Sequence, residues 1–235
     1  DDGAMTTGWL LIDVSYDEAT NDDYKYTAPT FNDDDDQTRW FYFKSNGKKL
    51  YADNGERTKD KTINGKKYAF DEYGASKGWF KVVPAEMLNK EKYDDDEESW
   101  YYADGSGNLY AGEFKTIKGK KYAFRNDGRM LTGLKFIKEG DEDFADVKAD
   151  DDDPNFDTED DFFDNAIEFY EPNGYKCYYF GGGDDGAMRT GKTTINYDGE
   201  NTSFYFEKSG GKKGAGVTGE KDDKLYQSGM LLKAD

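Results

Sequence analysis

The sequence predicts an all-β protein, a solenoid of stacked β-hairpins, and three observations carry this prediction. Short aromatic runs recur along the chain, glycine motifs of one pattern follow them, and tight-turn dipeptides stand between paired runs. Aromatic runs bounded by Gly, Asn and Asp are typical of short strands. One hairpin cannot bury its own apolar face, whereas stacked copies can. We therefore expect a single array of about seven repeats over residues 1–235.

The repeated unit has two parts. The first is an aromatic run, found at residues 40–43, 67–70, 100–103, 121–124, 177–180 and 203–206, with a degraded copy at 224–227. The second is Gly-x-Met-x-Thr-Gly, found at residues 3–8, 128–133 and 186–191, with looser copies at 74–78 and 214–219. Because the chain opens inside such a motif, with no aromatic run before it, we expect a fragment of a longer protein.

Short and long hairpins alternate. In the short ones a tight turn joins the strands: Asn64-Gly65 is the strongest short hairpin signal, since both central residues take positive φ. Lys118-Gly119 and Asp198-Gly199 stand at the same place. In the long hairpins the turn is replaced by an acidic insertion, and the three insertions cover about 13–38, 84–99 and 139–174.

The composition indicates a core made of rings. Hydrophobic residues are only 35% of the chain, below the share of about 45–50% usual in globular domains. Aromatic residues nevertheless reach 17%, with 19 Tyr, 16 Phe and 4 Trp. Tyr and Phe must therefore supply most of the buried surface.

Charge and residue usage exclude several functions. A net charge of −19 disfavours nucleic acid, whose binding depends on neutralising phosphates. No run approaches the roughly 20 apolar residues that span a membrane. The chain has no histidine and one cysteine, Cys177, so His-based triads, His-ligated metals and intramolecular disulfides are absent. A formal P-loop match at residues 186–193 precedes another hairpin rather than the helix that phosphate binding needs. We expect no enzyme activity.

The acidic runs leave two alternatives open. Asp33, Asp35, Asp151 and Asp153 could contribute to weak calcium sites, because Ca²⁺ prefers several carboxylate oxygens. None of the runs has the spaced ligands, central Gly and terminal Glu of an EF-hand loop. The other interpretation is a solvated loop whose like charges repel. No other cofactor is expected.

The order Gly-Trp, aromatic run, Gly-x-Met-x-Thr-Gly resembles the cell-wall-binding repeat superfamily, which includes choline-binding repeats. Residues 62–70 and 116–124 look especially like the repeats of large clostridial toxins and of glucan-binding enzymes. The resemblance covers nearly all the chain outside the insertions. It implies a secreted or cell-surface protein of a Gram-positive bacterium that binds cell-wall polymer, either teichoic acid or glycan, or host carbohydrate.

In choline-binding members, the Trp after Gly and the Trp that opens the aromatic run form a cage with an aromatic or Met residue from the next repeat. Carried over by position, the resemblance implies two such cages. The candidate ligand-binding residues are Trp9, Trp40 and Tyr42, and Trp79, Trp100 and Tyr102. The third long hairpin has Leu134 and Cys177 at the Trp positions, and the short hairpins have charged residues such as Glu113 after the Gly.

Two functions remain in view. The first is a non-catalytic binding module that recognises a surface polymer or carbohydrate through aromatic grooves between hairpins. The alternative is a structural or adhesion stalk whose acidic loops bind a protein partner or calcium. The tryptophans themselves could bind ligand or could be core rings, since a chain poor in aliphatic residues must bury rings.

Overall fold

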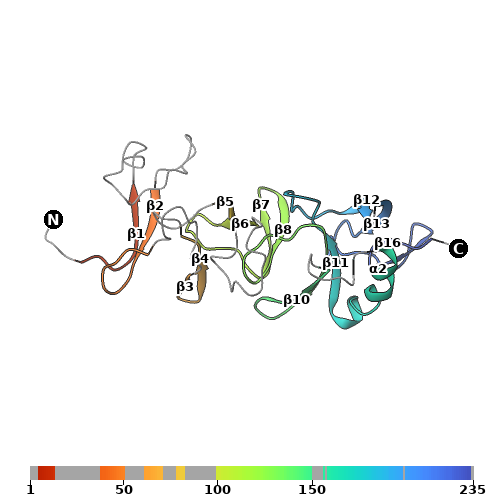
Figure 1. Cartoon of the computed structure of the whole chain (residues 1–235), viewed down its shortest axis with the longest axis horizontal. Helices are drawn as coiled ribbons and strands as arrows, with labels where there is room; N and C mark the ends of the chain where they lie inside the picture. The colour runs from red at the N-terminus through yellow and green to blue at the C-terminus, as the bar shows by residue number, and fades with distance from the viewer. Residues whose placement is uncertain are drawn as a thin grey trace. The chain divides into compact units, whose positions relative to one another are not determined.

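The structure is a computed structural model that describes residues 5–13, 38–50, 61–70, 78–82, 99–149, 156, 158–197 and 199–233. Almost all regular structure in these ranges is antiparallel β, which confirms the all-β prediction (Figure 1). The chain divides into two compact units, Asp1–Tyr110 and Ala111–Asp235. The number of repeats stays a prediction.

The first unit holds three antiparallel hairpins. They pair β1 (Gly8–Asp13) with β2 (Thr38–Phe43), β3 (Lys61–Ile63) with β4 (Lys66–Tyr68), and β5 (Gly78–Val82) with β6 (Ser99–Ala103). The aromatic runs supply the second strand of each pair, as the sequence predicts.

The second unit begins with one hairpin and continues with two larger sheets. The hairpin pairs β7 (Glu113–Ile117) with β8 (Lys120–Phe124). A three-stranded sheet follows in the order β10 (Phe144–Lys148), β9 (Leu134–Glu139), β11 (Tyr175–Tyr179). The last sheet has the order β12 (Gly191–Tyr197), β13 (Glu200–Phe206), β16 (Met230–Leu231), β15 (Lys224–Gln227), β14 (Gly219–Lys221).

The tight turns have the backbone that the sequence predicts. Asn64 and Gly65 take φ of 51° and 78°, and Lys118 and Gly119 take 48° and 80°. Two successive positive φ angles define the turn whose twist matches that of the flanking strands. Asn and Gly tolerate this region well, and Lys118 adopts it inside the same two-residue turn.

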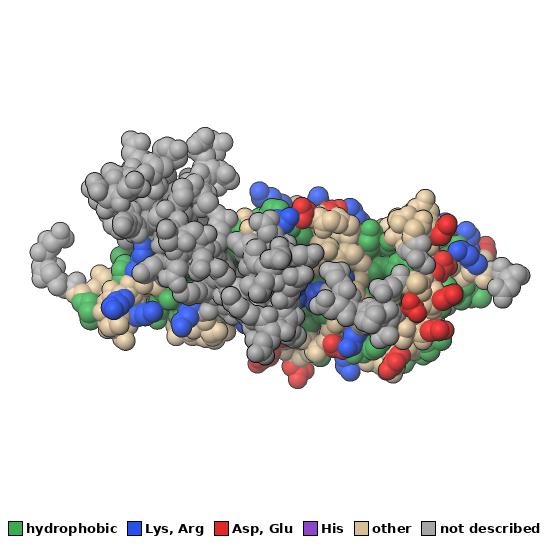
Figure 2. Space-filling view, in the orientation of Figure 1, with side chains coloured by type: hydrophobic (Ala, Val, Ile, Leu, Met, Phe, Trp, Pro, Cys, Tyr) green, Lys and Arg blue, Asp and Glu red, His purple; other side chains and the backbone are tan. Residues whose placement is uncertain are grey.

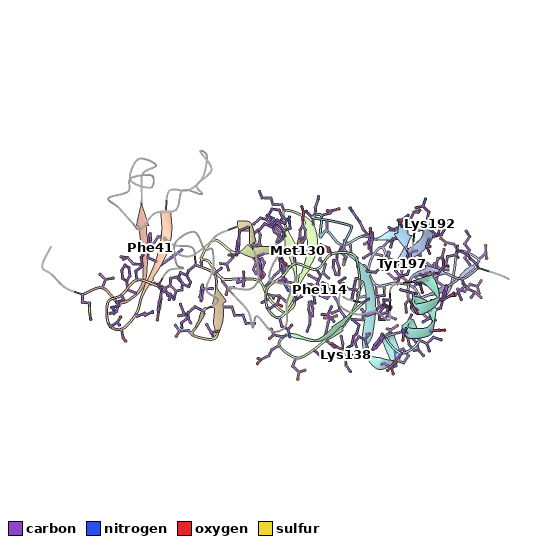
Figure 3. The ribbon with its side chains drawn as sticks, in the orientation of Figure 1. Phe41, Phe114, Met130, Lys138, Lys192 and Tyr197 are labelled. Carbon is purple, nitrogen blue, oxygen red and sulfur yellow. The ribbon has the colours of Figure 1, made fainter. Side chains whose placement is uncertain are left out.

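Rings make the core, which confirms the prediction from composition. Nine of the twelve largest fully buried side chains among the described residues are Phe or Tyr, and the others are Leu131, Ile137 and Met230. The second strand of a hairpin contributes rings to both faces. Phe41 is fully buried on one face of β2 (Figure 3), while Trp40 and Tyr42 are half-buried on the other, because side chains alternate along a strand.

The stretch between β9 and β11 folds in a way the sequence analysis does not predict. Besides β10 it contains the helix α2 (Glu159–Ala166) and the short 3₁₀ helix η3 (Glu171–Asn173). Thr158 caps α2, because its hydroxyl accepts a hydrogen bond from the Asp161 backbone N–H at 3.1 Å. In return, the Asp161 carboxylate accepts a hydrogen bond from the Thr158 backbone N–H at 3.2 Å. Phe162 and Ala166 of α2 enter the core. Figure 2 shows carboxylates gathered over the part of the second unit that carries α2.

Most of the acidic runs lie outside the described residues. Residues 14–37 and 83–98, which hold most of the first two predicted insertions, are among those not described, as are residues 150–155. The calcium candidates Asp33, Asp35, Asp151 and Asp153 therefore lie outside the described residues. The stalk function and the calcium sites stay predictions.

Candidate ligand-binding aromatic clusters

The structure brings together the six aromatic residues that the sequence singles out, as two separate clusters in the first unit. The first Trp cluster consists of Trp9, Trp40 and Tyr42, and the second of Trp79, Trp100 and Tyr102.

Strand register explains each cluster. Trp9 pairs directly with Tyr42, and Leu11 pairs with Trp40, so Trp40 lies diagonally from Trp9 on the same face. The second hairpin repeats this register, with Trp79 opposite Tyr102 and Lys81 opposite Trp100. Diagonal neighbours across an antiparallel pair are within reach of large side chains.

The two clusters have nearly the same geometry. The Trp9 and Trp40 ring centroids lie 6.2 Å apart at an interplanar angle of 89°, and those of Trp79 and Trp100 lie 6.3 Å apart at 86°. The directly paired Tyr lies 5.1 Å from the Trp in both clusters. All six residues are half-buried. Each cluster therefore offers two perpendicular indoles and a phenol at a hairpin face.

Trp9 also packs against the next hairpin. Its ring centroid lies 4.6 Å from that of Tyr68 and 6.0 Å from that of Phe70. Leu50 and Ile63 complete the core cluster to which these rings belong. The ligand and core interpretations of Trp9 are thus not exclusive, because part of the ring is used in packing and part remains exposed.

The second Trp cluster carries three further features. Tyr110 stacks on Tyr102 with centroids 5.2 Å apart. The Lys81 ammonium lies 5.9 Å from the Trp100 ring centroid. The indole Nε1 of Trp100 is buried and finds no hydrogen-bond acceptor among the described residues. Tyr110 lies outside every aromatic run, so the repeat pattern gave no signal for it.

Asp104 gives the second cluster a negative neighbour. Its carboxylate accepts from the backbone N–H groups of Ser106 and Asn108, both at 2.9 Å. Burial raises the pKa of Tyr102, and the nearby Tyr110 and Asp104 raise it further. A carboxylate beside neutral rings favours a cationic ligand group over an anionic one.

The third long hairpin does not form such a cluster. At the corresponding positions, Leu134 pairs with Tyr179 and Phe136 pairs with Cys177. Leu134 and Cys177 are buried, and burial raises the pKa of the Cys177 thiol. Phe136 packs against Phe156 and Phe162, with centroids 5.3 and 5.6 Å away. This face is filled by rings from the stretch between β9 and β11.

The β7–β8 hairpin contains a ring that the sequence analysis missed. Phe114, not Glu113, pairs with Ala123 and so occupies the place that Trp9 has opposite Tyr42. The ring centroid of Phe114, which is labelled in Figure 3, lies 5.0 Å from that of Tyr178 in β11 and 6.4 Å from that of Phe180, the residue after β11. Trp9 likewise contacts two aromatic residues that are two positions apart in the sequence, Tyr68 and Phe70.

In the part of the chain that the structure describes, no three Cys, Asp or Glu side chains are grouped so that they could hold a metal ion. Within that part, no helix has the length and apolar character that crossing a membrane requires. Residues 186–190 lead into strand β12 rather than into a helix, so the formal P-loop match lacks the helix that would bind a phosphate.

Comparison with known proteins gives matches among solved structures. No family model matches the chain, and no curated protein matches it. CbpJ from Streptococcus pneumoniae TIGR4 is 18% identical over 97% of this chain and 66% of that one, with a TM-score of 0.33. This chain thus spans just under two thirds of the length of CbpJ.

Two further structures from Streptococcus pneumoniae match at similar identity. Choline binding protein F, solved in the presence of a peptidoglycan analogue, is 22% identical over 96% of this chain and 80% of that one, with a TM-score of 0.21. The modular autolysin LytC is 21% identical over 83% of this chain and 37% of that one, with a TM-score of 0.28. The chain is thus similar to a group of structures that includes choline binding protein F.

Proposed function

We propose that the chain is a non-catalytic binding module of a secreted or cell-surface protein from a Gram-positive bacterium. Its ligand is a cell-wall polymer, either teichoic acid or glycan, or a host carbohydrate. The two Trp clusters hold this ligand at hairpin faces. The observation that carries the proposal is the recurrence of one three-ring geometry in two hairpins, with indole pairs 6.2 and 6.3 Å apart.

The chemistry of the rings defines what they can hold. A quaternary ammonium group beside indole faces gains about 0.5–2 kcal/mol from each ring through cation–π attraction. The C–H face of a sugar would pack on the same surfaces by apolar contact. Asp104, which lies beside Tyr102, adds attraction for a ligand that carries positive charge.

Two sites that share one ring geometry suit a repetitive ligand. When one cluster has bound a polymer, a neighbouring segment of that polymer is held near the second cluster at a raised effective concentration. The avidity of the two clusters together therefore exceeds the affinity of one cluster. Both clusters lie in the first unit. The module therefore needs only modest affinity at each cluster to hold a polymer that carries many copies of one group.

The test uses the full chain with Trp40→Ala, with Trp100→Ala and with both changes. Retention on purified Gram-positive cell walls and on a glycan array is measured. We expect each single variant to weaken retention and the double variant to abolish it. The matched control is Leu10→Ala, a partly exposed residue on the other face of the same hairpin. Unchanged retention by the double variant would disprove the proposal.

A further inference from the structure

The methionine of each Gly-x-Met-x-Thr-Gly motif packs against a glycine that comes later in the chain. The three pairs are Met5 with Gly47, Met130 with Gly186, and Met188 with Gly214. In every pair the motif precedes two paired strands and the glycine follows them, so the contact joins the chain before the pair to the chain after it (Met130 is labelled in Figure 3). A Cβ atom placed on any of these glycines would collide with the methionine side chain. Each thioether therefore fills the space that only a glycine leaves open.

The described methionines differ in their access to solvent. Met5 is 64% exposed and Met188 is half-buried, whereas Met130 is only 9% exposed and Met230 is fully buried. A methionine is oxidised at its sulfur, and the reaction requires that the oxidant reach this atom. A small oxidant in solution should therefore attack Met5 and Met188 well before the other two.

Met188 is also part of the core of the second unit. Its backbone N–H donates to the Lys121 carbonyl at 2.8 Å. Its side chain packs against a cluster of buried residues that includes Leu131, Tyr178, Phe180 and Ala215. Met188 thus touches β8, the end of β11 and the chain that follows β13. Met5, in contrast, is mostly in solvent, so only Met188 combines access to an oxidant with a place in the core.

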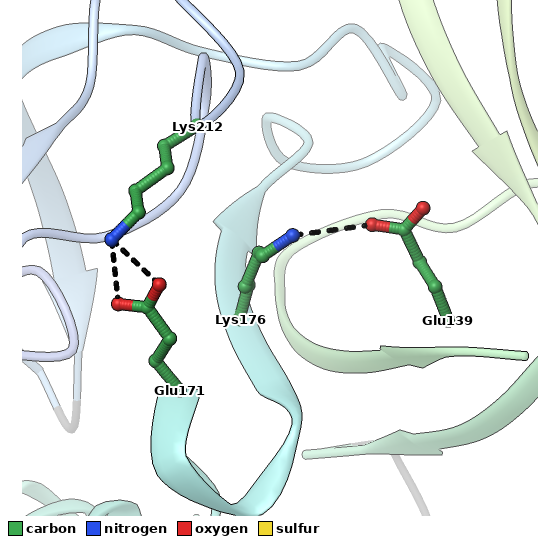
Figure 4. A network of polar contacts seen from close by, with 4 residues as sticks. All are labelled: Glu139, Glu171, Lys176 and Lys212. Atoms are coloured by element: carbon green, nitrogen blue, oxygen red, sulfur yellow. Dashed lines mark hydrogen bonds and ion pairs between the residues drawn. The ribbon is translucent and has the colours of Figure 1, made fainter.

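The segment that carries Gly214 is held in place from two sides. The Gly216 N–H donates to the Cys177 carbonyl at 2.7 Å. Lys212 forms an ion pair with Glu171 in η3, with the ammonium 2.6 and 2.8 Å from the two carboxylate oxygens (Figure 4). Because these contacts fix the segment on both sides of the glycine, it cannot move aside without breaking them.

An oxygen atom added to the Met188 sulfur would have neither room nor a partner at Gly214. The thioether already fills the place that a Cβ of this glycine would take. The N–H groups of Gly214 and Ala215 already donate to the carbonyls of Glu207 and Lys212, at 2.8 and 2.9 Å. A sulfoxide is polar, and burial of a polar group without a hydrogen bond is unfavourable. Oxidation would therefore push the side chain out of this contact.

We propose that Met188 is a site of reversible oxidation by peroxides that loosens the second unit. Hydrogen peroxide transfers one oxygen atom to the thioether: an S–O bond forms, the O–O bond breaks and water leaves. The sulfur loses two electrons and the peroxide gains them. Methionine sulfoxide reductases restore the thioether. The site goes beyond the proposed function, since both Trp clusters lie in the first unit.

The test treats the full chain with hydrogen peroxide and locates the added oxygen by mass spectrometry of its peptides. We expect Met5 and Met188 to be modified before Met130 and Met230. The urea midpoint of the modified chain should fall by about 0.5 M, because the sulfoxide loses its packing and finds no hydrogen bond. Treatment with both reductases, one for each epimer of the sulfoxide, should return the midpoint to its first value.

Two variants show which sulfur is responsible. Met188→Leu keeps an apolar side chain without sulfur, so peroxide should leave its own urea midpoint unchanged. Met5→Leu is the matched control, since it makes the same change at the same motif position, and it should lose as much as the parent.

Four results would overturn the proposal: Met188 stays unmodified, Met130 is modified first, the midpoint does not fall once Met188 is modified, or Met188→Leu loses as much as the parent. Retention on cell walls separates this proposal from the proposed function. The untreated Met188→Leu variant should be retained as the parent is, and a parent that is not retained would bear on the Trp clusters alone.

Discussion

The ammonium nitrogen of Lys121 lies 4.6 Å from the centroid of the Phe114 ring. Phe114 occupies in its hairpin the place that Trp9 occupies in the first one, so the chain supplies its own cation to this ring. The first Trp cluster and the β7–β8 hairpin thus share one strand register, in which the ring at this position contacts Trp40 in the first hairpin and the Lys121 ammonium in the β7–β8 hairpin.

Lys121→Met should lower the free energy of unfolding by about 0.5–1 kcal/mol, the value of a partly exposed cation–π contact. Methionine keeps most of the apolar stem and removes the charge. Urea denaturation of the full chain measures the change. Lys120→Met is the matched control, because Lys120 is exposed in the same strand. Equal losses in the two variants would contradict a specific contact between Lys121 and Phe114.

Trp9→Ala and Trp40→Ala should differ in their effect on stability. Trp9 packs on Tyr68 and Phe70, so its removal leaves a gap between two hairpins and should cost about 2 kcal/mol, less than a fully buried ring. Trp40 meets Trp9 edge to face at 6.2 Å and packs against the same core cluster without a ring contact to Tyr68 or Phe70 among the described residues, so its removal should cost less, about 1 kcal/mol. Urea denaturation checks the order, and a larger loss for Trp40→Ala would reverse our assignment of roles.

Thr158→Ala should destabilise the second unit by about 1 kcal/mol, because the variant loses the side-chain cap of α2. The helix presents Phe162 to the core, so fraying at its start loosens packing as well. Denaturation monitored by far-ultraviolet circular dichroism measures the effect. Asp164→Ala, at an exposed position of the same helix, should leave stability unchanged or slightly higher. The cap would have no such role if Thr158→Ala behaved like Asp164→Ala.

The second unit should lose stability at alkaline pH. Burial raises the pKa of Tyr175 from 10.0 to about 12, with help from the hydrogen bond to Asp146 and the charges of Asp146 and Glu168. Burial also raises the pKa values of Tyr178 and Cys177. Because the folded state holds these protons more tightly, their contribution is full below the unfolded pKa and is lost as pH rises through the folded pKa.

For Tyr175 this window runs from pH 10.0 to about 12. Urea midpoints of the full chain, measured across that window, should fall as the pH rises. Tyr175→Phe has no proton to lose at this position, so its midpoint should fall less steeply than that of the parent. A parent midpoint that stays constant or rises across the window would contradict the expectation.

The sequence was sufficient for the hairpin strands of the first unit, for the turn at Asn64-Gly65 and for the partners of Trp9 and Trp79. These depend on local signals, namely aromatic runs, positive-φ dipeptides and fixed offsets from glycine. These local signals did not predict the strand register of the β7–β8 hairpin. A slip of one residue moves every side chain to the other face of a strand, and only the folded pairing shows that Phe114 rather than Glu113 lies opposite Ala123.

The helix α2 was missed for a different reason. Its acidic residues Glu159, Asp160 and Asp161 merge in the sequence with the Asp run before them, and the whole stretch has the composition of a solvated loop. The distinguishing signals were Thr158 as a cap and Phe162 on the inner face. Two such residues decide the structure only because the faces of β9 and β11 give Phe162 a place to pack, and that surface arises from distant parts of the chain.

Trp9 belongs to one hairpin by covalent connection and to the next by its contact with Tyr68. A molecule bound beside Trp9 would therefore rest on two successive segments at once. Such a molecule would dissociate most readily when the two hairpins separate transiently. Its dissociation rate would therefore depend on how often they separate.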